Sequence, residues 1–343
     1  MRSLPASPAG GAATTDRWAP AREMDLQTLR PDRGRVLPVG AGITSAIGNT
    51  PVIELTRLNH TASDVRIFGK LEGANPGGSI KDRPAHYMIA SAERSGALTA
   101  AKTILEATSG NTGIALAMIG AAKGYRVKLC MPNCVSLERQ RILQALGAEV
   151  VLTSACEHTD GAIRTAHRLL ASAPGTYYMP NQYENQGNLL AHYETTGPEI
   201  FAQTAGRVDV VVAGMGTTGT LMGLHRFFAE RKPSVRIVGV EPAEGHAIQG
   251  LKNMTESMIP AIYDPNALDE KITIDDEEAF ETTRLLAVRE GVFVGMSSGA
   301  AVAAARRLAI DMRTGVIVAI LPDRGDRYLS TTLFRSVCAK CPP

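Results

Sequence analysis

The 343-residue sequence has few aromatic residues, no long apolar run and no excess of charge of either sign. Its net charge is +2, and no run of Lys and Arg is longer than a pair. Because nucleic-acid-binding chains usually carry a basic cluster or stripe, we expect no nucleic acid as a partner. No apolar stretch reaches the roughly 18 residues that a membrane span requires, so we expect no membrane association.

Cysteine is scarce as well, and its spacing indicates neither disulfides nor a metal site. Five cysteines form no disulfide framework, so we expect a reducing compartment, the cytoplasm. Cys338 and Cys341 form a lone CxxC, which we interpret as two tail thiols because zinc would need two further ligands. The seven histidines are scattered and no HExxH occurs, so we predict no metal.

From about residue 100, short β-type runs alternate with segments of helical period. Strand followed by helix, repeated, predicts parallel βαβ units of an α/β protein. Ligands in such folds bind beyond the carboxyl ends of the strands. The predicted strands are 102–107, 126–132, 148–153, 176–182, 208–214, 235–242, 270–276 and 316–322, and the predicted helices are 112–125, 136–147, 159–174, around 193–205, between 214 and 235, 277–291 and 297–311.

The run VVVAGMGTTGTLMG (210–223) satisfies the GxGxxG pattern of a dinucleotide-binding loop. Glu241 follows the next apolar run, where such proteins place the acid that binds a ribose hydroxyl. NAD is therefore one interpretation. The three threonines of this loop favour another, because a terminal phosphate has three free oxygens and profits from added hydroxyl donors.

The segment NPGGSIKDRPA (75–85) predicts a tight turn and then a helix that opens with Lys81 and has Pro84 in its first turn. The positive end of the helix dipole favours the neutral amine of a lysine placed there. A neutral amine is what a Schiff-base lysine needs. A surface lysine whose charge is offset by Asp82 explains the segment equally well.

A third loop, EATSGNTG (106–113), groups small hydrogen-bonding side chains at the start of a predicted helix. Such a loop suits a carboxylate or a phosphate, and it holds more hydroxyls and amides than a simple helix cap requires. A serine pair beginning at Ser297 opens a further helix and, taken alone, is a plain cap. Together with Lys81, these loops indicate pyridoxal 5′-phosphate (PLP) rather than NAD.

At this point the sequence resembles the cysteine synthase and cystathionine β-synthase family of fold-type II PLP enzymes. The resemblance covers about 290 residues, from IGNTPVIEL to LPDRGDRYLSTTLF, and includes GGSIKDRPA, EATSGNTGIALAMI, AHYETTGPEI and GMGTTGTLMG. It implies a fold like that of the tryptophan synthase β-subunit, with two domains that each hold a mostly parallel, twisted sheet flanked by helices. The expected parts are a disordered extension at 1–40, a larger phosphate-binding domain at 41–74 plus 186–334, a smaller mobile substrate-binding domain at 75–185 and a tail at 335–343.

The resemblance also implies roles for individual residues. Lys81 is expected to form the Schiff base and Asn111 to bond the ring hydroxyl of PLP. Ser297 is expected to meet the pyridine nitrogen. The phosphate is expected at Gly216, Thr217, Thr218, Gly219 and Thr220, and the substrate carboxylate at Thr108, Ser109, Thr112 and Gln182.

The implied reaction is a β-replacement on O-acetylserine or O-phosphoserine with a sulfur nucleophile, which gives L-cysteine through an α-aminoacrylate intermediate. The resemblance further implies a homodimer, and a sulfur-carrier protein is a candidate partner. Two alternatives stay open: an amine nucleophile that gives a 2,3-diaminopropionate-type product, and a PLP-binding regulator without activity. Lys252 stands where phosphoserine-using relatives carry an arginine, and we expect it to bind the leaving-group end of the donor.

Overall fold

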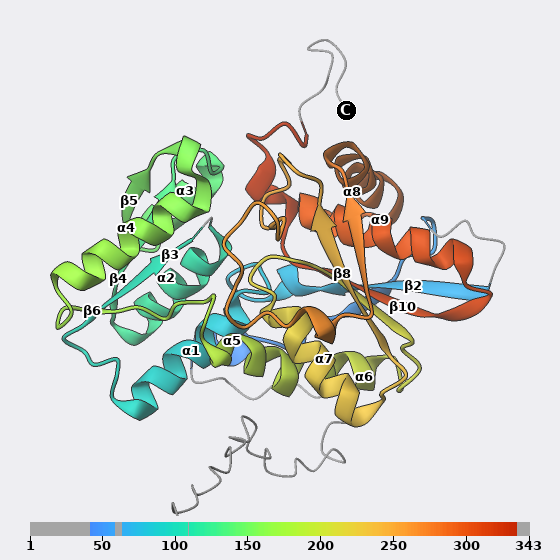
Figure 1. Cartoon of the computed structure of the whole chain (residues 1–343), viewed down its shortest axis with the longest axis horizontal. Helices are drawn as coiled ribbons and strands as arrows, with labels where there is room; N and C mark the ends of the chain where they lie inside the picture. The colour runs from blue at the N-terminus through green and yellow to red at the C-terminus, as the bar shows by residue number, and fades with distance from the viewer. Residues whose placement is uncertain (1–41, 59–63, 109, 335–343) are drawn as a thin grey trace, which may run out of the picture.

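The structure is a computed structural model that describes residues 42–58, 64–108 and 110–334. The predictions for residues 1–40 and 335–343, including Cys338 and Cys341, and for Ser109 lie outside these ranges. The described chain forms two sheets that lie side by side, each with helices on both faces (Figure 1).

The larger sheet has six strands, of which all but the first are parallel. Only β1 runs antiparallel, against β2. Such a sheet is expected from strand–helix repeats, because each crossover helix returns the chain to the same end of the sheet. The strand order is β1 (Val52–Glu54), β2 (Asp64–Leu71), β10 (Thr314–Leu321), β7 (Val210–Gly214), β8 (Arg236–Pro242) and β9 (Glu270–Ile274).

The helices of this half cover both faces of the six-stranded sheet. β7 alternates between them, because Val210 and Val212 belong to one core cluster and Val211 and Ala213 to the other. A strand buried on both faces reads as a continuous apolar run, as VVVA does. One face is covered by α8 (Asp276–Glu290) and α9 (Met296–Asp311), the other by α5 (Gln186–Ala191), a π-helical turn (His192–Thr196), α6 (Gly197–Gln203) and α7 (Gly219–Arg231).

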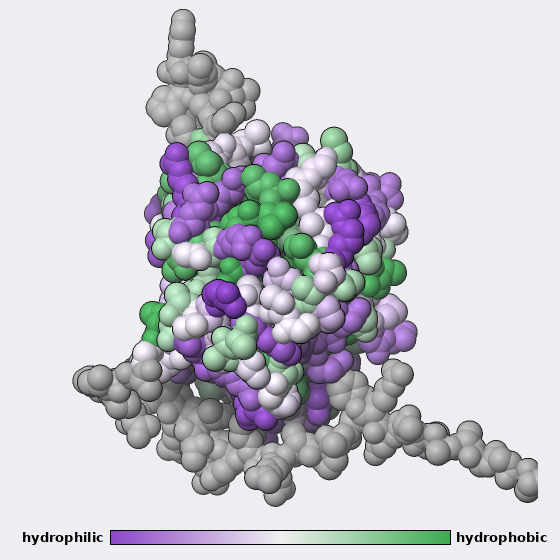
Figure 2. Space-filling model, turned by 90° about the vertical axis from the view of Figure 1, so that its left-hand side faces the viewer, coloured by the Kyte–Doolittle hydropathy of each residue, from purple (hydrophilic) through white to green (hydrophobic). Residues whose placement is uncertain are grey.

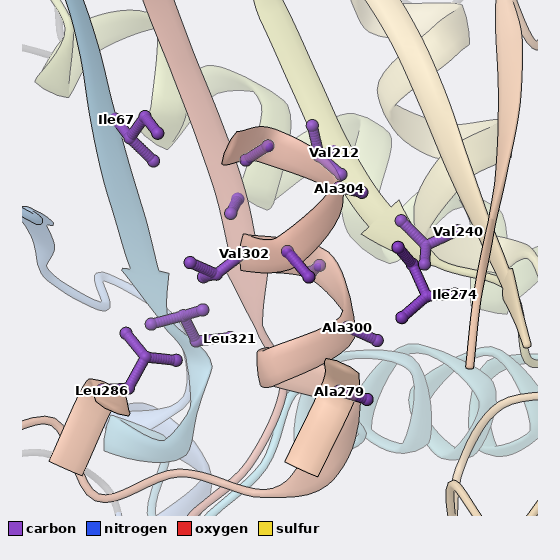
Figure 3. Packing of buried hydrophobic residues seen from close by; sticks show 14 of the residues in the cluster. Ile67, Val212, Val240, Ile274, Ala279, Leu286, Ala300, Val302, Ala304 and Leu321 are labelled. Atoms are coloured by element: carbon purple, nitrogen blue, oxygen red, sulfur yellow. The ribbon is translucent and has the colours of Figure 1, made fainter. Parts of the chain in front are cut away.

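Helix α9 packs closely because its buried face consists of small residues. Ala300 and Ala304 lie against the sheet side chains Val212 and Val240 (Figure 3). A Cβ atom on Gly299 would lie only 2.1 Å from the carbonyl oxygen of Ala279 in α8. The small residues of SSGAAVAAA therefore allow two helices and a sheet to approach one another.

The smaller sheet has four parallel strands in the order β5 (Glu149–Thr153), β4 (Arg126–Pro132), β3 (Thr103–Ala107) and β6 (Tyr177–Tyr178). α4 (His158–Ser172) covers one face, and α1 (Asp82–Ser95), α2 (Asn111–Lys123) and α3 (Leu137–Ala145) lie on the other. α1 also packs against α5, so it joins the two halves of the molecule. The outer side of this half mixes polar and apolar side chains in small groups (Figure 2).

Most predicted elements are present within a residue or two, but two differ and two strands of the structure were not predicted. The strand predicted at 176–182 is only Tyr177–Tyr178, because only these two residues pair with β3. The helix predicted around 193–205 is divided into the π-helical turn and α6. β1 and β2 were not predicted, because the strand prediction begins at residue 100. β1 has only three residues, whereas the alternation of polar and apolar residues in DVRI, at the start of β2, is a signal that could have revealed it. Short 3₁₀ turns complete the described chain at Ile43–Ala46, Glu72–Ala74, Ala155–Glu157, Pro265–Ala267 and Gly325–Tyr328.

Candidate active site

A cavity of about 780 Å³ lies where the carboxyl ends of strands from both sheets face each other. This volume is within the usual range of small-molecule sites. Each sheet contributes the loops that follow its central strands, as expected for parallel α/β proteins. Its lining includes these predicted site residues: Lys81, Thr108, Asn111, Thr112, Gln182, Gly216, Thr217, Thr218, Thr220, Lys252 and Ser297.

Lys81 is the residue immediately before α1 and is half-buried at the cavity wall. The backbone around it is tied to the end of β10, because the N–H of Ile80 donates to the carbonyl of Pro322 at 2.8 Å. Burial lowers the pKa of the Lys81 amine, and the nearby carboxylates of Asp323 and Glu72 offset part of this effect. The amine is thus biased toward the neutral form that can react as a nucleophile.

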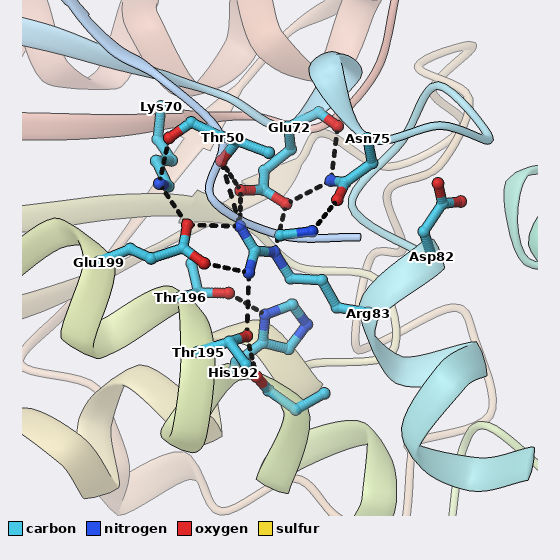
Figure 4. Close-up of polar contacts among 12 residues, drawn as sticks. Thr50, Lys70, Glu72, Asn75, Asp82, Arg83, His192, Thr195, Thr196 and Glu199 are labelled. Carbon is cyan, nitrogen blue, oxygen red and sulfur yellow. Dashed lines mark hydrogen bonds and ion pairs between the residues drawn. The ribbon is translucent and has the colours of Figure 1, made fainter. Parts of the chain in front are cut away.

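A buried charge network links Arg83, in the first turn of α1, to the carboxylates of Glu72 and Glu199 (Figure 4). Arg83 donates to both oxygens of Glu72, at 2.7 and 2.8 Å, and to both oxygens of Glu199, each at 2.7 Å. Lys70 adds a 2.6 Å contact to Glu199. Burial raises the pKa of Glu72, but the Arg83 guanidinium outweighs it and lowers this pKa to about 2. The network joins α1 to the end of β2 and to α6, and it therefore positions the helix that follows Lys81.

The loop from Gly216 to Thr220, which leads into α7, has a backbone that neighbouring atoms enclose tightly. Thr218 adopts a left-handed conformation with φ of 64°. A Cβ atom on Gly216 would lie 2.7 Å from the carbonyl oxygen of Gly250, and one on Gly219 would lie 2.1 Å from Oδ1 of Asn188. A side chain at position 216 would therefore clash with backbone, and one at position 219 would displace the amide of Asn188, while the amides at the start of α7 are available to an anion.

Two side chains that the sequence did not reveal support the hydroxyls of this loop. Nδ2 of Asn188 donates to Oγ1 of Thr217 at 3.0 Å, and Nε2 of His192 lies 3.2 Å from Oγ1 of Thr220. Burial lowers the pKa of His192 well below its ordinary value, with Arg83 adding to the effect. A neutral imidazole beside the hydroxyl orients it without adding charge. No local spacing connects these residues to the loop, although AHYETTGPEI is part of the family resemblance.

The loop that is predicted to bind the substrate carboxylate (106–113) is held by hydrogen bonds of Thr108 and Thr112. Oγ1 of Thr108 accepts the N–H of Gly110 at 3.0 Å, so this hydroxyl closes the turn and keeps its own proton to donate. Oγ1 of Thr112 donates to Oε1 of Gln182 at 2.6 Å. This places Gln182, which is distant in sequence, beside the start of α2. Three of the predicted carboxylate-binding residues therefore lie together, and the fourth, Ser109, is outside the described ranges.

Asn111 belongs to a polar cluster at the end of β10. Its Nδ2 donates to Oδ2 of Asp323 at 2.6 Å, and its Oδ1 accepts a hydrogen bond from Arg327. The hydroxyl of Tyr328 donates to the same oxygen of Asp323 at 2.7 Å, and burial raises the pKa of this phenol. No role was predicted for these side chains of DRGDRYL, although the position of the motif directly after a buried strand is a usable signal.

Arg139 of α3 connects the two halves across this cluster. Its guanidinium donates to the Tyr328 hydroxyl at 2.7 Å and lies 4.7 Å from the centre of that ring. It also bonds the side chain of Gln249. A Cβ atom on Gly110 would lie 2.3 Å from Cδ of Arg139, so the arginine packs directly under the substrate loop.

Ser297 and Glu241 have different positions relative to the cavity. Ser297, the second residue of α9, lines the cavity and is 4% exposed. Glu241 accepts the N–H of Met254 at 2.8 Å and pairs with Lys271 at 3.1 Å. Its carboxylate therefore holds the segment after β8, which contradicts the ribose-binding interpretation.

Lys252 reaches the cavity from the segment between β8 and β9. Its ammonium is 3.6 Å from Oδ1 of Asp160 and 5.0 Å from the centre of the Tyr183 ring. Burial lowers the pKa of Lys252, and Asp160 opposes this shift. The predicted cation is therefore present in the cavity, but it has a carboxylate partner that the sequence did not indicate.

The residues present fit PLP. The cavity combines a half-buried amine of lowered pKa, an anion-binding loop whose glycines leave no space for a Cβ atom, and a neutral serine at a helix start. Within the described ranges, no group of three or more His, Cys, Asp or Glu is arranged to hold a metal ion. In the same ranges no helix combines the length and apolarity needed to cross a membrane.

The sequence was compared with protein families and with known proteins. The family model described as "Pyridoxal-phosphate dependent enzyme" matches residues 43–323. Cysteine synthase B of Salmonella typhimurium is 47% identical over 292 residues, which cover 85% of this chain and 95% of that protein. Cysteine synthase B of Pseudomonas aeruginosa is 46% identical over 292 residues, with 85% and 97% covered.

Solved structures of similar fold include the cysteine synthase (OASS) of Entamoeba histolytica. It has a TM-score of 0.82 and 38% identity, with 88% of this chain and 92% of that chain covered. O-ureido-L-serine synthase has a TM-score of 0.83 and 38% identity, with 89% and 98% covered. The likeness in structure therefore extends over both sheets.

Proposed function

The chain belongs to the family of pyridoxal-phosphate dependent enzymes, and we propose that it replaces the β-substituent of an O-activated L-serine with a sulfur nucleophile to give L-cysteine. The family, the α/β fold class and the PLP cofactor predicted from the sequence are confirmed. The observation that carries the proposed reaction is the position of Lys81 in one cavity with a phosphate-type loop and a separate carboxylate-type loop.

Four features of the chain would hold the cofactor. Lys81 would bind it covalently, the loop from Gly216 to Thr220 would hold its phosphate, Asn111 would bond the ring hydroxyl, and Ser297 would meet the ring nitrogen. When bound, PLP withdraws electrons from the α-carbon of an amino acid and so permits loss of the α-proton and the β-substituent. The hydroxyl of Ser297 carries no charge, so it cannot keep the ring nitrogen protonated as an aspartate would.

The remaining residues bind the donor and move its proton. The α-carboxylate would be oriented by four side chains, and this directs the α-carbon toward Lys81. The four are Thr108, Ser109, Thr112 and Gln182. The Lys81 amine, once free, accepts the α-proton and later returns it. Its lowered pKa suits both steps, because an amine that titrates closer to neutral pH can accept and release a proton.

A visible absorption spectrum and turnover assays test this proposal. The purified protein should show the absorption band of bound PLP and should form cysteine from O-acetylserine and sulfide. Lys81→Ala should abolish the band and lower kcat/KM by about 10²–10⁴-fold. Lys123→Ala, which removes a surface lysine paired with Glu93 at 2.8 Å, should change neither. A colourless wild-type protein, or a Lys81→Ala variant with full activity, would refute the assignment.

The acceptor needs its own assay, because the fold accommodates different acceptors. One structure of similar fold is named for the product O-ureido-L-serine, which contains no sulfur atom. Sulfide, thiosulfate, a carrier-protein thiocarboxylate and an amine should be compared at equal concentration with the same donor. The proposal requires a sulfur compound to be the best acceptor; preference for the amine would instead support the 2,3-diaminopropionate alternative.

The homodimer, the sulfur-carrier partner and the cytoplasmic location stay predictions. Light scattering of the holoenzyme tests the homodimer, because a homodimer has twice the 36.4 kDa mass of the chain. The division into domains at residues 75 and 186 is likewise a proposal. It is supported by the assignment of β3–β6 to one sheet and of the remaining strands to the other.

A further inference from the structure

The end of the cavity near Lys252 is formed by both halves of the molecule. Lys252 comes from the segment after β8, Asp160 from the first turn of α4 and Tyr183 from the chain after β6. The ammonium lies 3.6 Å from Oδ1 of Asp160 and 5.0 Å from the Tyr183 ring. The Lys252 and Asp160 side chains are 10% and 29% exposed. A partly buried ion pair therefore joins the two halves at this end of the cavity, and an aromatic ring lies against its cation.

The other charges at this end are also balanced. Arg164 pairs with Glu157 at 2.8 Å, and both residues line the cavity. Glu256, another lining residue, is an additional acid whose carboxylate accepts the N–H of Gly245 at 3.1 Å. Among the ionisable side chains described at this end, the number of carboxylates is thus at least equal to the number of lysines and arginines. A donor that enters here does not meet an uncompensated cation.

We propose that Asp160 is a specificity-determining residue that disfavours donors with a phosphate leaving group and thereby favours uncharged esters such as an acetyl group. This inference rests on the proposed function and specifies its donor. An ester carbonyl can accept one N–H of the Lys252 ammonium while Asp160 keeps another, because the ammonium has three donors. A phosphate dianion has to share the same cation with a carboxylate only a few ångströms away, and like charges at that distance repel strongly in a partly buried site.

Asp160→Asn tests the proposal, because asparagine keeps the shape of the side chain and removes its charge. In the holoenzyme, kcat/KM should be measured for O-phosphoserine and for O-acetylserine with sulfide as acceptor. The ratio of the phosphoserine value to the acetylserine value should rise by about 10–100-fold, mainly through the KM for phosphoserine. Asp160→Glu should restore a ratio close to that of the wild type.

Two matched variants separate the local effect from general ones. Glu149→Gln removes a carboxylate that pairs with Lys128 at 2.9 Å on the same small sheet but does not line the cavity, and it should leave the ratio unchanged. Lys252→Met should lower the ratio, because the phosphate then loses its cation while the Asp160 carboxylate stays. An equal change for both donors, or an unchanged ratio, would overturn the proposal and would make the pair a structural contact only.

Calorimetry with inorganic phosphate gives a readout that does not need turnover. Phosphate should bind the Asp160→Asn holoenzyme at least tenfold more tightly than the wild type, whereas equal affinity would contradict the proposal. If the wild type converted neither donor, the proposed function would fail, and this binding measurement would still decide the role of Asp160.

Discussion

Replacing Arg83 with methionine should be one of the most destabilising single changes near the site. Methionine keeps an unbranched apolar stem but removes four hydrogen bonds to the carboxylates of Glu72 and Glu199. Glu199 would keep Lys70 at 2.6 Å, whereas fully buried Glu72 would keep hydrogen bonds only from neutral groups such as the Thr50 hydroxyl at 2.6 Å, with the charge of Lys70 acting without a hydrogen bond. The cost is therefore dominated by one buried carboxylate without a directly paired cation.

The magnitude follows from that carboxylate. Breaking a buried ion pair by removing one partner costs about 3–5 kcal/mol. Glu72 can limit the cost by taking up a proton, which at pH 7 requires ~3 kcal/mol for a carboxyl with an ordinary pKa near 4.5. Both routes give a loss of about 3–5 kcal/mol in the free energy of unfolding.

Urea unfolding of the holoenzyme, followed by circular dichroism, measures this loss, and the visible band of PLP reports on the site. The folded pKa of Glu72, about 2, lies below its ordinary value of 4.5, so its charge stabilises the wild type above pH 4.5. That contribution is lost as the pH falls from 4.5 toward 2, so the gap between wild type and Arg83→Met should narrow in this window. Glu72→Gln in the Arg83→Met background should recover part of the stability, because it removes the buried charge. A loss below ~1 kcal/mol at pH 7, or no recovery in the double variant, would refute the reasoning.

Three further substitutions test other parts of the site. Burial raises the pKa of Glu106 to about 8, so the stability that its neutral form contributes should be lost as the pH rises from 4.5 to 8. Glu106→Gln should flatten this pH dependence in thermal unfolding. An unchanged slope would contradict the raised pKa of Glu106. Arg139→Met should raise the KM of the donor at least about tenfold with the PLP band intact, because it releases α3 from Tyr328. An unchanged KM would show that the contact between Arg139 and Tyr328 has no role in donor binding. Gly219→Ala should weaken PLP binding at least about tenfold in titrations of the apoenzyme, because its Cβ would lie 2.1 Å from Oδ1 of Asn188, and full affinity would mean that the loop relaxes freely.

Much of the candidate site was predictable because its signals are local. A lysine before a helix with proline in its first turn, and threonines among glycines after a buried strand, can each be read within a dozen residues. The dinucleotide interpretation of GMGTTG was reasonable on the same signals, since both kinds of loop place a phosphate at a helix start. Glu241 is a case where spacing alone misleads, because its carboxylate holds the backbone of Met254.

The sequence by itself determined the order of most strands and helices after residue 100, the family, the cofactor and the placement of Lys81 at the start of a helix. The order of the elements, the cofactor and the position of Lys81 follow from hydrophobic periodicity and turn chemistry, which act over short stretches of chain, whereas the family follows from the resemblance of longer motifs. Only the tertiary structure decided which distant side chains meet in the cavity: Asp160 with Lys252, and Arg139 with Tyr328. Such pairs depend on how two separately formed sheets pack against each other, and no spacing along the chain encodes that distance.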